Sequence, residues 1–110
     1  MTRYGKVIRA RADKIDEYKR LHAAPWPDVL AMIKKCNIHN YSIYLRQLAD
    51  DQYYLFSYFE YSGDDFAADM AKMAADPTTQ EWWSFTGPCL IPLDSRVKGE
   101  VDMEEVFHLD

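Results

Sequence analysis

The segment Tyr18–Pro27, YKRLHAAPWP, decides how the first half of this 110-residue chain folds. Residues four apart lie on one face of a helix, so this spacing places the ring of Tyr18 beside that of His22. The two prolines then end the helix, because proline lacks an amide hydrogen and disfavours helical backbone in the residue before it. The segment therefore predicts a tyrosine and a histidine paired near a helix end, beside a bend that contains Trp26.

Periodicity on both sides of this bend predicts the other elements. In chain order these are a strand at 3–10, a helix capped by Asp13 that reaches the prolines, a helix from Pro27 to about Asn37, strands at 38–45 and 53–61, a helix at 64–75 capped by Ser62-Gly63-Asp64, a helix from Asp76-Pro77 to Gly87-Pro88, an irregular connection at 88–102 and a last strand at 103–109. Along 38–45, strict alternation puts His39, Tyr41, Ile43 and Leu45 on one face. Residues 1–110 are expected to form a single domain.

The order of these elements, with each helical region broken once, is β-α-β-β-α-β. This is the ferredoxin-like plan of the α+β class, an antiparallel sheet with its helices on one face. The strand at 53–61 carries large apolar or aromatic residues at both odd and even positions. Such a strand is expected to be buried on both faces, which predicts a homodimer joined through its sheets.

Composition excludes several classes of protein. The net charge of −5 and the lack of a Lys/Arg run argue against a nucleic-acid partner, and no apolar run suits a membrane partner. A cytoplasmic location is expected, with Cys36 and Cys89 as buried free thiols, since their spacing suits neither a metal site nor a redox motif. Eight Tyr, five Phe and three Trp suit either an interface or a polyhydroxylated ligand.

Four motifs occur in a characteristic order along nearly the whole chain. They are His22-x-x-x-Trp26-Pro27, Asn40-Tyr41-x-Ile43-Tyr44, Trp82-Trp83 and Glu105-Val106-Phe107-x-Leu109. In this order they resemble the L-rhamnose mutarotase family. The resemblance implies a dimeric α/β-barrel of two ferredoxin-like subunits that interconverts the α and β anomers of a 6-deoxy sugar without a metal or organic cofactor.

The resemblance also assigns roles to five residues. It implies His22 as the proton donor and Tyr18, Tyr41, Trp82 and Trp83 as the residues that bind the sugar. An imidazole titrating near neutral pH suits proton transfer during ring opening and closing. From the residues alone, Tyr41 could equally pack in the core. Adjacent tryptophans point about 100° apart on a helix, so one of the pair could fill the core instead.

Two departures from the family pattern, the Ala-rich helix at 64–75 and the connection at 94–102, concern the choice of sugar. L-rhamnose is the first candidate and L-fucose the second. Two further classes of protein stand as alternatives: a cofactor-free oxygenase of the dimeric α/β-barrel type, and a non-catalytic sugar-binding or assembly domain. Fold alone does not discriminate among these functions.

Overall fold

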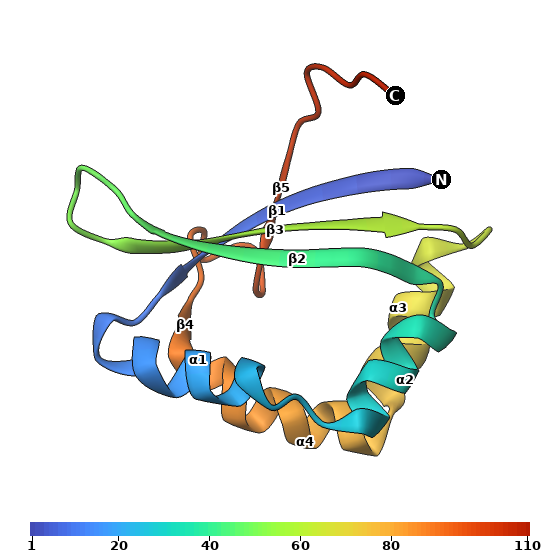
Figure 1. Ribbon diagram of the computed structural model, residues 1–110, viewed down its shortest axis with the longest axis horizontal. Helices are drawn as coiled ribbons and strands as arrows, with labels where there is room; N and C mark the ends of the chain where they lie inside the picture. The colour runs from blue at the N-terminus through green and yellow to red at the C-terminus, as the bar shows by residue number, and fades with distance from the viewer.

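The computed structural model describes residues 1–110 (Figure 1). Its elements are β1 (Thr2–Ala10), the 3-10 turn η1 (Ala12–Lys14), α1 (Ile15–Ala23), α2 (Pro27–Lys35), β2 (Ile38–Gln47), β3 (Tyr53–Tyr61), α3 (Phe66–Ala75), α4 (Pro77–Thr86), the 3-10 turn η2 (Gly87–Cys89), β4 (Leu90–Ile91) and β5 (Val101–Met103). None of the helices has the length and apolar character needed to cross a membrane.

The strands form one antiparallel sheet in the order β2-β3-β1-β4, with β5 also paired to β1. β4 and β5 thus share the place of the fourth strand. All four α-helices lie on one side of this sheet, below it in Figure 1. The predicted ferredoxin-like α+β fold is confirmed.

Two helix starts occur where the proline positions predict them. Pro27 is the first residue of α2, after Trp26 in extended backbone, and Pro77 is the first residue of α4. The carboxylate of Asp76 caps α4 by accepting hydrogen bonds from the backbone N–H and the hydroxyl of Thr79. These starts depend on local chemistry, because proline needs no amide partner in the first turn and a short acid satisfies a free N–H there.

Two predicted caps are wrong. Asp13 lies inside η1, where its carboxylate pairs with Arg11, and the residue before α1 is Lys14, which makes no side-chain cap bond. Helix α3 is capped by Asp65, which accepts a hydrogen bond from Ala68 N–H, and not by Ser62-Gly63-Asp64. In both cases several neighbouring acidic or small polar residues could cap the N-terminus of the helix. The position in which the helix packs decides where it begins and therefore which residue is the cap.

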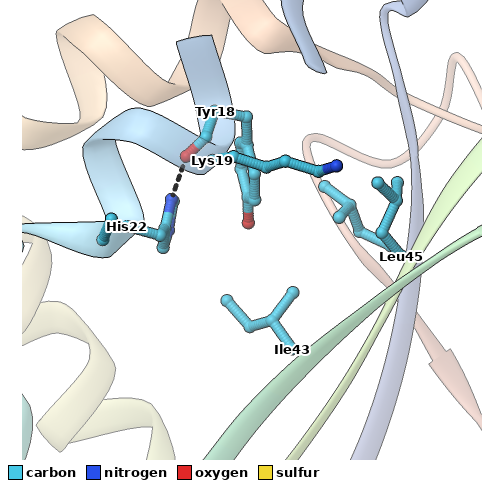
Figure 2. A pocket seen from close by; sticks show the side chains of 7 residues that line it. Tyr18, Lys19, His22, Ile43 and Leu45 are labelled. Atoms are coloured by element: carbon cyan, nitrogen blue, oxygen red, sulfur yellow. Dashed lines mark hydrogen bonds between the residues drawn. The ribbon is translucent and has the colours of Figure 1, made fainter. Parts of the chain in front are cut away.

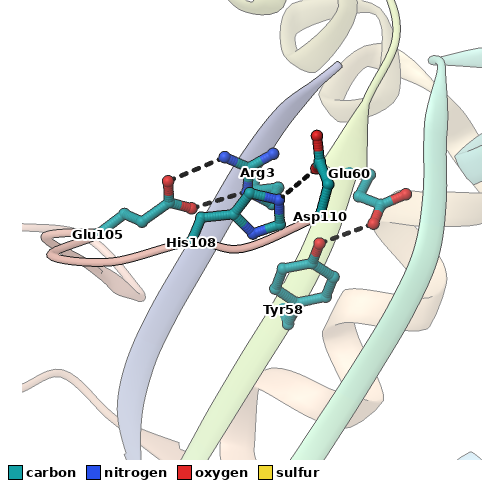
Figure 3. Close-up of polar contacts among 6 residues, drawn as sticks. All are labelled: Arg3, Tyr58, Glu60, Glu105, His108 and Asp110. Carbon is teal, nitrogen blue, oxygen red and sulfur yellow. Dashed lines mark hydrogen bonds and ion pairs between the residues drawn. The ribbon is translucent and has the colours of Figure 1, made fainter.

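The predicted last strand at 103–109 is also wrong. Strand β5 covers only Val101–Met103, so β4 and the first two residues of β5 lie in the stretch predicted to be irregular, and only Met103 falls within the predicted strand. Beyond it the tail leaves the sheet, with Val106, Phe107 and Leu109 between 79% and 85% exposed. A bidentate ion pair from Arg3 to Glu105 joins this tail to β1 (Figure 3). The apolar residues of the tail suggested a buried segment, but apolar character alone does not determine that the segment pairs as a strand in this sheet.

A β-bulge interrupts the alternation of β2. Asn40 has a φ of 48°, and the register with β3 shifts between His39 and Ser42. His39 consequently lies opposite Glu60 on the helix-free face, while Ile43 lies opposite Ser57 on the helix side. The prediction that His39 shares a face with Ile43 is therefore wrong, because an extra residue reverses the alternation.

The core lies between the sheet and the helices, as three small clusters. Ile8, Ala10 and Leu55 form one; Leu21, Val29 and Trp82 form the second; Ile38, Phe59 and Tyr61 form the third. Both cysteines are free and buried, as predicted. The opposite face of the sheet carries no helix, and its central row is Tyr44, Phe56, Val7 and Val101.

Candidate functional site

A pocket of about 330 Å³ opens between α1 and the sheet. Its walls are Tyr18, Lys19, His22 and Ala23 from α1, Ile43 and Leu45 from β2, and Leu55 from β3. Figure 2 shows the α1 side chains projecting toward Ile43 and Leu45. The volume is within the range of small-ligand sites, roughly 300–1,000 Å³. The pocket therefore has the size for a monosaccharide.

His22 is held in one tautomer and one orientation. Its Nδ1 lies 2.9 Å from the backbone carbonyl oxygen of Tyr18, which can only accept, so Nδ1–H donates (Figure 2). The imidazole stacks on the Tyr18 ring at 4.1 Å between centroids and meets the edge of Trp82 at 5.4 Å. Because Nδ1 carries the hydrogen, Nε2 is the nitrogen that gains and loses a proton.

The two neighbouring tryptophans have different environments. Trp82 is 6% exposed and packs among Leu21, Val29 and Trp26. Trp83 is 44% exposed. Its position is four residues after Thr79 and three before Thr86, which are both buried on the inward side of α4. Neither ring lines the pocket beside His22. The structure brings Trp82 against the histidine as a core residue and leaves the Trp83 ring accessible to solvent.

Tyr18 and Tyr41 come from opposite sides of the interior. Tyr18 projects from α1, whereas Tyr41 belongs to β2 and its ring lies 5.6 Å from that of Phe59. Burial raises the pKa of both phenols, and the charge of Glu100 raises both further. Although 42% of Tyr41 is accessible, the surrounding chain desolvates its hydroxyl. Both phenols therefore stay protonated at neutral pH and can serve as hydrogen-bond donors.

Three residues of this region were not predicted from the sequence. Lys19 borders the pocket directly. Glu100 is half-buried and acts electrostatically on both tyrosines. Ser57 is 5% exposed on the helix side of β3, and its hydroxyl has no hydrogen-bond partner. Of the three, only Ser57 could have been noticed in the sequence, because it is the one small polar residue in an otherwise largely aromatic strand.

The arrangement suits proton transfer to a neutral polar ligand. It combines an oriented imidazole and the Tyr18 phenol with aliphatic walls from Ala23, Ile43, Leu45 and Leu55. No group of three or more His, Cys, Asp or Glu side chains converges in a way that could hold a metal ion. The fold and the site thus define a ferredoxin-like α+β protein with a largely apolar pocket between helix and sheet that contains a histidine and a tyrosine.

Comparison with known proteins identifies the family. The family model described as L-rhamnose mutarotase matches residues 3–109. An L-rhamnose mutarotase of Oceanobacillus iheyensis is 34% identical and one of Bacillus subtilis 30% identical, each over the full length of both chains. The chain belongs to the L-rhamnose mutarotase family and is an isomerase of the mutarotase type.

Solved structures agree with the fold. A crystal structure of an L-rhamnose mutarotase from Formosa agariphila matches over both whole chains, with a TM-score of 0.76 and 21% identity. Tetracenomycin F2 cyclase from Streptomyces glaucescens also matches over both whole chains, with a TM-score of 0.68 and 13% identity. Since a polyketide cyclase shares this architecture, the fold by itself does not assign a reaction.

Proposed function

We propose that this protein interconverts the α and β anomers of L-rhamnose by acid/base-assisted opening and closing of the pyranose ring. The observation that carries the proposal is His22, whose Nδ1–H is fixed on Tyr18 and whose ring faces a monosaccharide-sized pocket. Membership of the L-rhamnose mutarotase family supports this sugar ahead of L-fucose. It also favours a mutarotase over an oxygenase or a binding domain.

The proposed roles follow from the chemistry of anomer exchange. The ring oxygen must gain a proton as the C1–O5 bond breaks, and protonated Nε2 of His22 supplies it. The hydroxyls of Tyr18 and Tyr41, held in their neutral form by burial, donate hydrogen bonds to sugar oxygens. The accessible ring of Trp83 offers a flat apolar surface to a C–H face of the sugar, while Trp82 supports His22 from behind.

The test is magnetisation exchange between the anomeric protons of an equilibrated sugar at neutral pH, with and without the protein. Exchange that appears only with the protein, and is faster for L-rhamnose than for L-fucose, is expected. Faster exchange of L-fucose would overturn the sugar assignment and keep the reaction. Binding without exchange would overturn the mutarotase activity in favour of a sugar-binding domain.

We further propose that two copies pair through the helix-free face of the sheet. Its central row of Tyr44, Phe56, Val7 and Val101 is apolar, and Tyr44 is 64% exposed. A continuous apolar row without a covering layer favours a sheet-to-sheet interface. The exposed tail residues Val106 and Phe107 would add apolar surface to the same interface.

Replacing Phe56 by glutamate is expected to convert the protein from a dimer to a monomer, because it places a charge in the centre of the row. Light scattering should give twice the 12.9 kDa chain mass for the unmodified protein and the single mass for the variant. Lys34→Glu on the exposed side of α2 is the control and should stay dimeric. A monomeric unmodified protein would disprove the pairing.

We place the enzyme in the cytoplasm. Its two buried thiols, Cys36 and Cys89, are unpaired, as is usual in a reducing compartment. Fractionation of cells that produce the protein would test this location, and recovery from an extracellular fraction would contradict it.

A further inference from the structure

A row of side chains crosses the helix side of the sheet beneath Tyr18 and ends at Glu100. Leu45 lies opposite Leu55, and Leu55 opposite Ile8. Val7 lies opposite Val101, so the residue before Val101 is next to Ile8 in the antiparallel register. The chain entering β5 reaches the helix side of the sheet in Figure 1. Tyr18 packs on the Ile8–Leu55 cluster, and the charge of the half-buried Glu100 acts on its hydroxyl. The register therefore places the carboxyl group of Glu100 on the Tyr18 side of the sheet.

The neighbouring row on the same side is polar. It runs from Ile43 through Ser57 and Lys6 to Asp102. Lys6 Nζ donates to Asp102 at 2.8 Å, and this pair is complete. The hydroxyl of Ser57 is buried without a hydrogen-bond partner. This oxygen is closed off from solvent, and the Lys6–Asp102 pair occupies the other carboxylate at this edge of the sheet.

The groups that face Glu100 come from four elements, α1, β2, β1 and β5. Tyr18 reaches it from α1, Tyr41 from β2, and Lys6 and Asp102 lie at its own edge of the sheet. Burial raises the pKa of Glu100, Lys6 opposes this rise, and Asp102 adds to it. A carboxyl group with a raised pKa is a stronger base than an ordinary one.

We propose that Glu100 is the second proton-transfer group of the mutarotase, acting together with His22. This inference rests on the proposed function. Glu100 is the carboxyl group that the register brings to the Tyr18 side of the interior, whereas Asp102 is engaged by Lys6. The tyrosines cannot take this role, because they hold their protons at neutral pH.

The proton balance is closed within the site. In ring opening, Glu100 carboxylate takes the proton of the anomeric hydroxyl, the C1=O1 double bond forms, and the C1–O5 bond breaks. O5 takes a proton from the imidazolium of His22. After rotation about C1–C2, O5 attacks the other face of C1, its proton returns to His22, and Glu100 returns its proton to O1. These reaction steps require neither an oxidant nor a cofactor.

The test is Glu100→Gln, which keeps the side-chain shape and removes the base. We expect the exchange rate of L-rhamnose at saturation to fall about 100-fold, with KM changed less than twofold. Activity of the unmodified enzyme should fall at acidic pH as Glu100 takes up a proton, and this decline should vanish in the variant. Asp102→Asn, at the neighbouring carboxylate, is the control and should keep the acidic decline.

Each other outcome overturns the inference in a different way. A Glu100→Gln protein with the rate and pH profile of the unmodified enzyme would remove Glu100 from the reaction and leave the proposed function intact. A rise in KM alone would make Glu100 a binding contact. A slower enzyme that keeps the acidic decline would indicate only a structural role. No exchange by the unmodified protein would overturn both proposals together.

Discussion

Replacing His22 by alanine is expected to slow anomer exchange by roughly 10²–10⁴-fold, the usual contribution of a positioned general acid or base. The loss is expected in the rate at saturating sugar, because the imidazole acts on the proton in transit and contributes little to sugar binding. The fold should persist, since α1 keeps its backbone bonds and Tyr18 stays packed on the Ile8–Leu55 cluster. Magnetisation exchange with L-rhamnose and near-ultraviolet circular dichroism measure the two effects.

Two matched variants make this result specific. His39→Ala removes an exposed histidine of β2 that hydrogen-bonds the hydroxyl of Ser62, and it should leave the exchange rate unchanged. Tyr18→Phe keeps the ring that stacks on His22 and deletes the hydroxyl, so a partial loss is expected. Retention of the full rate by His22→Ala would remove this residue from the mechanism and, with it, the main support for the proposed function.

Replacing Trp82 by alanine is expected to lower the free energy of unfolding by about 3–5 kcal/mol, the usual loss when a large ring is removed from a packed interior. Trp82 is 6% exposed and contacts both His22 and Trp26, so its loss opens a cavity and also frees the imidazole. Urea unfolding at a fixed protein concentration measures the change, because pairing of chains would make the midpoint depend on concentration.

Trp83→Ala is the control. It should have little effect on stability and a larger effect on sugar binding. Its ring is 44% exposed, so the free energy of unfolding should fall by about 1 kcal/mol or less. Loss of a flat surface for the sugar should instead raise KM for L-rhamnose. Equal destabilisation by the two substitutions would contradict the division into a core ring and a ligand-facing ring.

The sequence by itself determined the elements whose ends depend on neighbouring residues. Pro27 and the Asp76-Pro77 pair start their helices because the first turn has free N–H groups that proline lacks and aspartate satisfies. The four-residue spacing of Tyr18 and His22 likewise fixed their contact, because an α-helix brings such residues together wherever it packs. Local geometry is sufficient for these predictions, and they hold.

Only the tertiary structure decided the features that depend on strand register and on which side chains are buried in the core. The bulge at Asn40 turned His39 away from the helices, and the short β5 left the apolar tail outside the sheet. Burial also separated Trp82 from Trp83 on adjacent positions of one helix. Glu100 reached the interior through pairing between residues more than 90 positions apart in the chain. Such contacts depend on which distant segments bury each other, and no local pattern along 94–102 encodes that choice.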